Sequence, residues 1–89
     1  MSIRNVSIII PCYKAAATLR RAVASALTDA PSDIEILLVD DGSPDDTGAL
    51  CDELAAADPR ITALHRENGG AGAARNTGLD AASGEWVLF

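Results

Sequence analysis

The sequence contains few aromatic residues, few lysines and no long apolar run. Tyr13, Trp86 and Phe89 are the only aromatic residues among 89, so the core must be built from aliphatic side chains and alanine. Lys14 is the only lysine, and the formal net charge is −6. An acidic chain argues against non-specific binding to nucleic acid or to an anionic membrane, because both require a basic face. No apolar run is long enough to cross a bilayer.

Cysteine is scarce as well. Cys12 and Cys51 lie far apart in the sequence without metal-type spacing, which predicts two reduced thiols in a cytoplasmic protein. The first five residues are too short and too polar for a secretory signal peptide. The strand-like segment 85–89 is followed by no turn residue or polar tail. We therefore expect a fragment of a longer protein, with an edge at 85–89 that is available for self-association.

Strand-like and helix-like segments alternate along the chain. Apolar, β-branched runs predict strands, and apolar residues at three- and four-residue spacing predict helices. The expected strands are residues 6–10, 34–39, 61–64 and 85–89, and the expected helices are 15–27, 43–58 and 71–82. This alternation predicts one small α/β domain with a mostly parallel sheet, helices on both faces and right-handed crossovers. With the first strand in the centre, the strand order is 3-2-1-4.

Some features of the helices are specific enough to compare with a structure. In the first expected helix, Leu19, Ala22 and Val23 belong to the inward face. Ser43 is expected to cap the second helix. In the third helix, Gly78 costs on the order of 1 kcal/mol relative to alanine, so we expect it to permit close packing.

The second expected strand ends abruptly in two adjacent carboxylates, Asp40 and Asp41, which are followed by Gly42. We call residues 40–43 the acidic turn. Glycine lets the backbone turn sharply, and ligands of open α/β sheets bind outside the carboxyl ends of the strands. The segment 11–14, which follows the first expected strand, would open beside this turn. We therefore expect a ligand site where these two loops meet.

Four segments, in order, resemble the family 2 glycosyltransferases. They are residues 6–14 (VSIIIPCYK), 36–47 (ILLVDDGSPDDT), 68–79 (NGGAGAARNTGL) and 84–89 (GEWVLF), and together they cover nearly the whole chain. The last segment resembles the strand that leads to the Asp-x-Asp motif of that family. The resemblance implies a Rossmann-like GT-A half-domain. Residues 1–89 would form its incomplete N-terminal nucleotide-sugar-binding part, which ends just before that motif.

For the parent protein, the resemblance implies an enzyme of polysaccharide or cell-wall biosynthesis. It would transfer a sugar from a nucleoside-diphosphate sugar, most often a UDP-sugar, to a hydroxyl of a saccharide or lipid-linked acceptor, with inversion. A divalent cation, Mn²⁺ or Mg²⁺, would bridge the diphosphate to the Asp-x-Asp acids. Those acids and the general base would lie beyond residue 89, so we expect this chain alone to be inactive. The parent would act in the cytoplasm or at the cytoplasmic face of the membrane.

The resemblance also assigns roles to the acidic turn. Asp41 corresponds to a family carboxylate that accepts a hydrogen bond from the uracil ring. A carboxylate selects a base well, because a wrong partner leaves a charge unpaired. The structural alternative is that Asp41 only caps a turn or the following helix, which we set aside because Ser43 is the expected cap. Asp40 either shares the contact with the base or orders the loop.

Pro11, Tyr13 and Arg75 complete the expected nucleotide site. Pro11 would act through its carbonyl and its rigidity, and Tyr13 would either stack on the base or pack on the sheet edge. Arg75 would approach the diphosphate or order the acidic turn by pairing with one of its carboxylates. Lys14 departs from the asparagine that is usual in the family. His65 is a lone histidine, for which we expect a surface or loop role.

Two other classes of function remain as alternatives. The first is a non-catalytic nucleotide-binding module, which an Asp-x-Asp directly after Phe89 would argue against. The second is a receiver-like signalling domain, which also carries an acidic pair at a strand end. It is less well supported, because no lysine follows Lys14 and no aspartate ends the third expected strand. A dinucleotide-binding fingerprint is rejected, because Arg75 stands where its third glycine is required.

Overall fold

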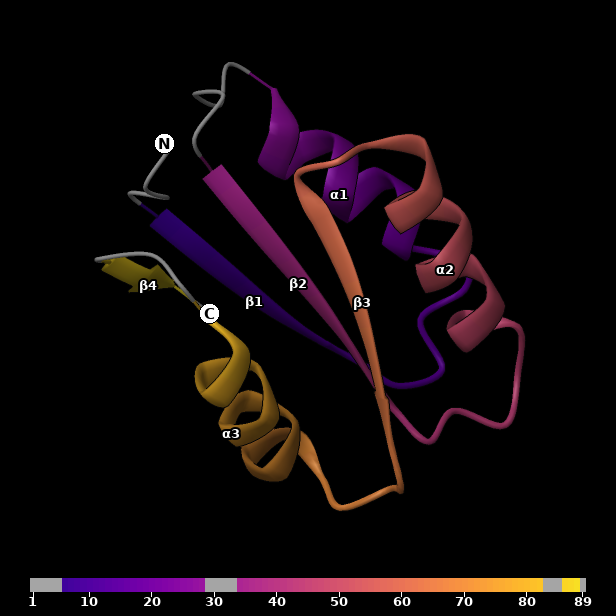
Figure 1. Ribbon diagram of the computed structural model, residues 1–89. Coiled ribbons are helices and arrows are strands. Elements are labelled where there is room, and N and C mark those ends of the chain that lie inside the picture. Colours follow the sequence, from indigo (N-terminus) through magenta and orange to yellow (C-terminus); the bar gives the residue numbers. More distant parts are fainter. Residues whose placement is uncertain (1–5, 29–33, 83–85, 89) are drawn as a thin grey trace.

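A computed structural model of the protein describes residues 6–28, 34–82 and 86–88. The strands are β1 (Val6–Cys12), β2 (Ile34–Asp41), β3 (Ile61–Arg66) and β4 (Trp86–Leu88), and the helices are α1 (Leu19–Leu27), α2 (Thr47–Ala57) and α3 (Ala71–Ala81). The strands form one parallel sheet of order β3-β2-β1-β4 (Figure 1). The predicted α/β class and strand order are confirmed.

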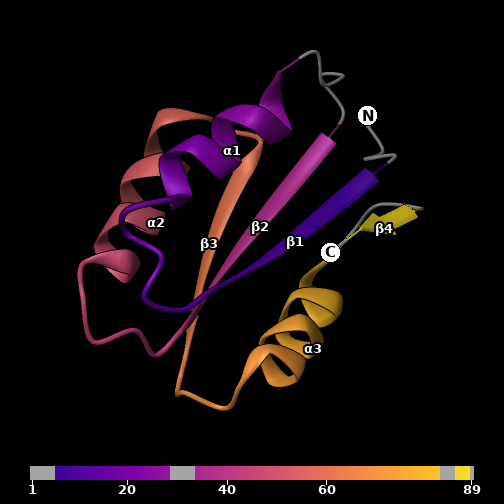
Figure 2. The same cartoon turned by 180° about the vertical axis from the view of Figure 1, so that it is seen from behind.

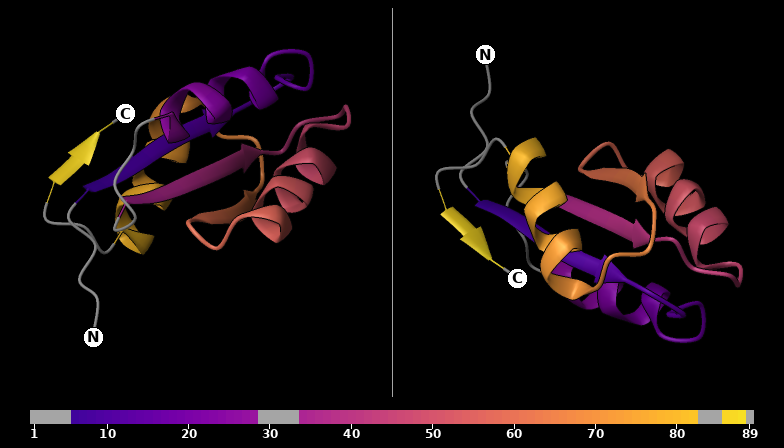
Figure 3. Two further views of the ribbon diagram at one scale, coloured as in Figure 1. Left: turned by 90° about the horizontal axis from the view of Figure 1, so that it is seen from above. Right: turned by 90° about the horizontal axis from the view of Figure 1, so that it is seen from below.

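The sheet separates two helical layers. α1 and α2 cover one face and α3 covers the other, as Figures 1 and 2 show from opposite sides and Figure 3 shows from above and below. β2 lies between β1 and β3, and its apolar residues alternate between the two layers. Ile36 and Leu38 pack in the core beneath α1 and α2, whereas Leu37 and Val39 pack beneath α3.

α3 lies very close to β1 because of Gly78. A methyl group at Gly78 would lie 2.5 Å from Cγ2 of Ile9, well inside van der Waals contact. The lack of a side chain therefore lets this helix approach the sheet, and the predicted packing role of Gly78 is confirmed. The buried core on this face consists of Ile9, Leu37, Val39 and Ala74.

β1, β2 and β3 each extend two residues further than predicted. The apolar runs end at Ile10, Val39 and Leu64, but the pairing of backbone groups in a sheet does not depend on side-chain polarity. The residues that follow these runs, which are polar after Val39 and Leu64 and are Pro11 and Cys12 after Ile10, therefore belong to strands, where neighbouring side chains point to opposite faces. In the register, Cys12 pairs with Asp40, Asp40 pairs with His65, and Asp41 pairs with Arg66.

α1 begins later than predicted. The expected helix began at Ala15, but the amides of Thr18 and Leu19 both donate to the Ala15 carbonyl in a turn, and regular helix begins at Leu19. Leu19 and Val23 are buried as predicted, whereas Ala22 is exposed. At 3.6 residues per turn, Ala22 lies on the flank of the stripe that Leu19 and Val23 define.

α2 begins at Thr47, so the prediction that Ser43 caps this helix is wrong. Asp46 occupies the N-cap position, and the Asp45 carboxylate accepts hydrogen bonds from the amide and the hydroxyl of Thr47. The physical reason is that the Ser43 hydroxyl is engaged by the loop after β1. Because Ser43 does not cap α2, the argument against a purely structural role of Asp41 no longer holds.

Some expectations lie outside the described residues. They are the two ends of the fourth expected strand, Glu85 and Phe89. Cys12 and Cys51 are free thiols, both buried. None of the helices in the described ranges is both long and apolar enough to cross a membrane.

Candidate functional site

The acidic turn and the loop after β1 lie side by side at the carboxyl ends of their strands (Figure 2). The Ser43 hydroxyl accepts a hydrogen bond from the Lys14 amide at 3.2 Å and donates one to the Cys12 carbonyl at 3.4 Å. The Ala15 amide also donates to the Thr47 hydroxyl at 2.9 Å, which joins the same loop to the start of α2. The predicted meeting of the two loops is confirmed, and Ser43 is the residue that joins them.

The two carboxylates of the acidic turn point to opposite faces of the sheet. Asp40 lies on the face of α2 and Asp41 on the face of α3, because successive side chains of a strand alternate. Both residues are buried, with 7% and 3% of their surface exposed. They therefore do not form a carboxylate pair that could hold one metal ion or share one proton.

The Asp41 carboxylate is engaged by the loop between β3 and α3. Its Oδ1 accepts the Gly69 amide at 3.0 Å, and its Oδ2 accepts the Gly70 amide at 2.9 Å. Nδ2 of Asn68 lies 3.3 Å from Oδ2, and Nε of Arg66 lies 3.3 Å from Oδ1. Gly70 is the N-cap residue of α3, so the Asp41 charge stabilises the positive end of that helix. Asp41 thus has a structural role, whether or not it also contacts a ligand.

Gly42 brings the acidic turn against the same loop. Its φ of 67° is in the left-handed region, and a methyl group at this position would lie 2.6 Å from the backbone nitrogen of Asn68. The Asn68 side chain donates from Nδ2 to the Asp41 carbonyl at 3.0 Å. The sharp glycine turn predicted here is confirmed, and it has the added effect of packing two loops together.

The Asp40 carboxylate is held by the acidic turn itself and by β3. Its Oδ1 accepts the Ser43 amide at 3.1 Å, and its Oδ2 lies 3.1 Å from Nδ1 of His65. Nε2 of His65 lies 2.8 Å from Oδ1 of Asp52 on α2. His65 is exposed at the surface, as expected, and it also bridges two carboxylates there. The signal that could have found it is the register, which sets His65 opposite Asp40.

These contacts stabilise the charged forms of both Asp40 and His65. Burial alone would raise the pKa of Asp40, but hydrogen bonds from His65 and Ser43 outweigh it and lower that pKa below its ordinary value of 3.8. The hydrogen bonds to Asp52 and to Asp40 raise the pKa of His65 above its ordinary value of 6.5. An ionised carboxylate can only accept, so a ring that meets a carboxylate at each nitrogen is fully satisfied only as the imidazolium.

Tyr13 is a large side chain that the fold leaves exposed, with 47% of its surface accessible. Nζ of Lys14 lies 5.4 Å from the centroid of its ring, within the range of a cation–π contact. Pro11, two residues before Tyr13, is half-buried within β1, opposite Val39 of β2.

Arg75 is exposed on α3. The ion pair with Asp41 that was considered for Arg75 is made by Arg66, which comes from β3. Nη1 of Arg66 also donates to the Ala73 carbonyl and to the Thr77 hydroxyl, so this guanidinium connects Asp41 to α3. The pairing was missed because the predicted third strand ended before Arg66.

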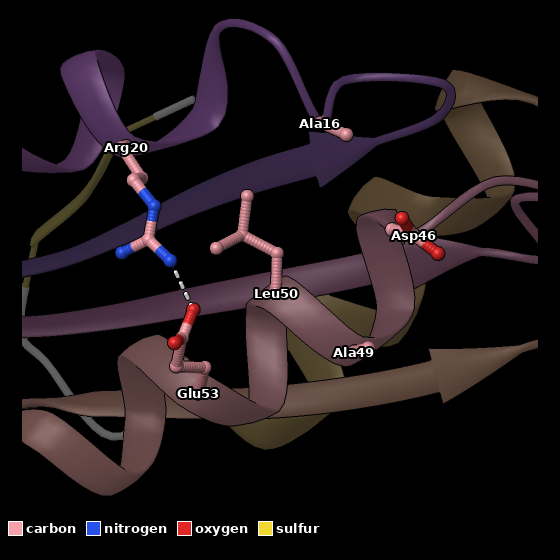
Figure 4. A pocket seen from close by; sticks show the side chains of 6 residues that line it. All are labelled: Ala16, Arg20, Asp46, Ala49, Leu50 and Glu53. Atoms are coloured by element: carbon pink, nitrogen blue, oxygen red, sulfur yellow. Dashed lines mark hydrogen bonds and ion pairs between the residues drawn. The ribbon is translucent and has the colours of Figure 1, made fainter.

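A groove of about 520 Å³ lies between α1 and α2 (Figure 4). Arg20 of α1 and Glu53 of α2 form an ion pair across it. Both side chains are 61% exposed, and exposed pairs of this kind contribute only about 0–1 kcal/mol. The groove includes none of the predicted nucleotide-binding residues and therefore does not mark that site. It is lined by Ala16, Arg20, Asp46, Ala49, Leu50 and Glu53.

The described side chains of the acidic turn do not fit a divalent cation. Among the described residues, no group of three or more His, Cys, Asp and Glu side chains is arranged to hold a metal ion. Asp40 and Asp41 face opposite sides of the sheet and accept hydrogen bonds from the protein itself. The acidic turn is therefore a hydrogen-bonded structure that shapes two loops, and not a metal centre.

The similarity to known proteins extends over nearly the whole chain. The family model for "Glycosyl transferase family 2" matches residues 7–89. The chain is 44% identical over 84 residues to the uncharacterized glycosyltransferase EpsJ of Bacillus subtilis. It is 42% identical over 85 residues to glycosyltransferase GlyA of Streptococcus pneumoniae, and 41% over 85 residues to glycosyltransferase GlyG of the same species.

These matches cover different shares of the proteins compared. They include 94%, 96% and 94% of this chain, but only 24%, 12% and 28% of EpsJ, GlyA and GlyG. The chain thus spans about a quarter of the length of EpsJ and of GlyG, and a smaller share of GlyA. The matched residues include both loops of the candidate site, and the fold is the α/β arrangement that the four sequence segments implied. This chain belongs to glycosyl transferase family 2.

Proposed function

We propose that the protein transfers a sugar from a nucleoside-diphosphate sugar, and that this chain binds the nucleotide of the donor. The proposal is carried by one observation: Ser43 joins the loops at the carboxyl ends of β1 and β2, and an exposed Tyr13 ring lies in one of them. Ligands of open α/β sheets bind at this edge. Membership of the family supplies the sugar-transfer chemistry.

In this proposal, Tyr13 and Asp41 recognise the base. Stacking on an aromatic ring contributes about 1–3 kcal/mol per base, and the Pro11 carbonyl is a further contact. Asp41 accepts the N3–H of uracil, whereas adenine would present an acceptor nitrogen to the same carboxylate and leave it unpaired. Because Asp41 already accepts several donors, the base replaces one of them. The Nδ2 of Asn68, at 3.3 Å and on an exposed residue, is the most easily replaced.

Arg75 and Asp40 have the remaining roles. Arg75, an exposed residue of α3, meets the diphosphate through its guanidinium, because planar forked donors bind phosphate well. Asp40 orders the acidic turn through the Ser43 amide, which agrees with the structural one of its two expected roles. Selection of UDP over ADP therefore depends on Asp41, and the affinity depends mainly on Tyr13.

The transfer itself takes place on groups outside residues 1–89. A general base removes the proton of the acceptor hydroxyl, and the hydroxyl oxygen attacks the anomeric carbon. The bond from that carbon to the diphosphate oxygen breaks with inversion, and the nucleoside diphosphate leaves. The Mn²⁺ or Mg²⁺ ion, the saccharide or lipid-linked acceptor, and a place in polysaccharide or cell-wall biosynthesis stay predictions.

Three further expectations also stay predictions. They are the cytoplasmic location, self-association through residues 85–89, and the inactivity of residues 1–89 without the rest of the enzyme. Sedimentation of this chain at several concentrations measures the self-association. Sugar transfer by residues 1–89 from any donor would show that the chain contains a complete active site.

Titration with UDP, GDP and ADP, followed by amide chemical shifts, tests the nucleotide site. We expect UDP to bind most tightly and to shift the amides of Tyr13, Gly42 and Ser43. Tyr13→Ala weakens UDP binding about tenfold, whereas Tyr13→Phe retains the stacking ring and binds like the wild type. Equal affinity for the three nucleotides, or unshifted amides in both loops, would contradict the assignment of the base site.

A non-catalytic nucleotide-binding module would pass that test, so a second measurement is required. The protein at its natural length is incubated with UDP-sugars and saccharide acceptors, and the release of UDP is measured. Release that depends on the acceptor supports the transferase. Tight binding of UDP without release from any donor would favour the binding module.

A further inference from the structure

His65 lies where three elements meet at the carboxyl edge of the sheet. It belongs to β3, faces Asp40 of β2 in the register and contacts Asp52 of α2. Its two ring nitrogens lie 3.1 Å and 2.8 Å from carboxylate oxygens of these residues. Gly48 of α2 makes the approach possible, because a methyl group there would lie 2.6 Å from Oδ2 of Asp40.

The hydrogen bonds continue from this pair to both nucleotide loops. The second oxygen of the Asp40 carboxylate accepts the Ser43 amide. The Ser43 hydroxyl in turn holds the Lys14 amide and the Cys12 carbonyl, on either side of Tyr13. A change at His65 therefore reaches the acidic turn through Asp40 and reaches the loop after β1 through Ser43.

The groups that face His65 are acidic or neutral. β2 contributes Asp40, and α2 contributes Asp52 and the thiol of Cys51. On β1, the Cys12 thiol lies near Asp40. Its contact with Cys51 and its burial raise the pKa of Cys12, so it stays neutral. The imidazolium of His65 is therefore the cation between two carboxylates.

We propose that His65 is a positioning residue, which holds the Asp40 carboxylate against the Ser43 amide and so keeps the acidic turn in the shape that binds the donor nucleotide. The last step, binding of the nucleotide, rests on the proposed function. Loss of a ring proton leaves a nitrogen lone pair facing a carboxylate, so one of the two bonds becomes a repulsion. In the neutral tautomer that keeps its proton on Nε2, this lone pair is on Nδ1 and faces Asp40, so the acidic turn loosens and affinity for the nucleotide falls as the pH rises.

The first experiment uses the free protein. NMR follows the His65 ring and the Ser43 amide between about pH 5 and pH 9, where a histidine titrates. We expect both signals to share one midpoint, and Asp52→Asn to move it to lower pH, because Asp52 contributes most to the raised pKa of His65. Asp52 is 65% exposed, so this variant should fold.

Asp80→Asn is the matched control, since Asp80 is an exposed acid on α3. We expect it to leave both midpoints where they are in the wild type. A Ser43 amide that does not follow the His65 ring, or a midpoint that Asp52→Asn leaves unchanged, would overturn the positioning role.

The second experiment measures the dissociation constant for UDP against pH. In the wild type we expect it to rise above the midpoint of the ring titration. His65→Arg provides donors to both carboxylates and does not titrate, so it retains the low-pH affinity and loses the pH dependence. His65→Gln is neutral and binds UDP about tenfold more weakly at low pH. Full affinity in His65→Gln would overturn the inference.

Together the experiments separate this role from the proposed function. If the Ser43 amide follows His65 but UDP binds at no pH, the proposed function fails and the positioning of the acidic turn stands. If UDP binds with the same affinity at every pH and the Ser43 amide signal does not change with the His65 titration, the nucleotide site stands and the positioning role is overturned.

Discussion

Asp40 and His65 stand at the same register position of β2 and β3, with 3.1 Å between Oδ2 and Nδ1. One position further along, Asp41 and Arg66 repeat the arrangement on the opposite face of the sheet. The two acids at the end of β2 are thus matched by two basic residues at the end of β3. Buried charges persist when they are paired and hydrogen-bonded, and this matching provides both conditions.

Gly48→Ala tests how closely α2 approaches this pair. The added methyl group would lie 2.6 Å from Oδ2 of Asp40, so the carboxylate must move away from its position beside His65. We expect the pKa of His65 to fall toward its ordinary value, as measured by NMR titration of the ring. Gly72→Ala is the control, because a methyl group there meets nothing within 4 Å. An unchanged titration in Gly48→Ala would contradict the contact.

The free energy of unfolding should depend on pH through the same two residues, His65 and Asp40. The raised pKa of His65 contributes stability that is complete below its ordinary value of 6.5 and is lost as pH rises through the folded-state pKa. The lowered pKa of Asp40 contributes stability above 3.8 that is lost as pH falls through its folded-state pKa. The ring is 45% exposed, so solvent screening keeps the alkaline loss small.

Urea unfolding at a series of pH values measures this dependence. His65→Gln should remove the loss of stability at alkaline pH. It should leave the loss of stability below pH 3.8 that arises from other carboxylates with a lowered pKa, Asp45 and Asp58. If the wild type and His65→Gln lose stability in parallel above neutral pH, the loss arises from another group.

Asp41→Asn removes one acceptor oxygen from the loop before α3. The new amide nitrogen is a buried donor that cannot accept, so it faces the amide of Gly69 or Gly70, which loses its partner. A buried donor without a partner costs about 1–3 kcal/mol, and we expect a loss of stability in that range by urea unfolding. Asp80→Asn, at an exposed site on α3, should change stability by less than about 0.5 kcal/mol.

Gly78→Ala tests the close packing of α3 on β1. Alanine improves helix propensity by about 1 kcal/mol, but its methyl group would lie 2.5 Å from Cγ2 of Ile9. Overpacking of this kind costs about 1–3 kcal/mol, so we expect net destabilisation in thermal or urea unfolding. Gly72→Ala, in the same helix with open space around it, should be neutral or stabilising. A stabilised Gly78→Ala protein would show that α3 shifts at little energetic cost.

Local patterns in the sequence predicted most of the elements and the meeting of the two loops. They were least accurate at the ends of elements. The predicted strands stop at Val39 and Leu64, where the sequence changes from apolar to polar residues, whereas the observed strands continue for two more residues. The cap at Ser43 was wrong because its hydroxyl has partners, Lys14 and Cys12, that are distant in the sequence.

By itself, the sequence determined the order of strands and helices, the parallel α/β architecture and the family, because periodicity and motifs are properties of neighbouring residues. Only the tertiary structure decided how the acidic turn is held. Asp40 and Asp41 are adjacent in the chain, yet they point to opposite helical layers and pair with His65 and Arg66. Those partners follow from strand register and from the packing of α2 and α3. Both depend on contacts between distant residues.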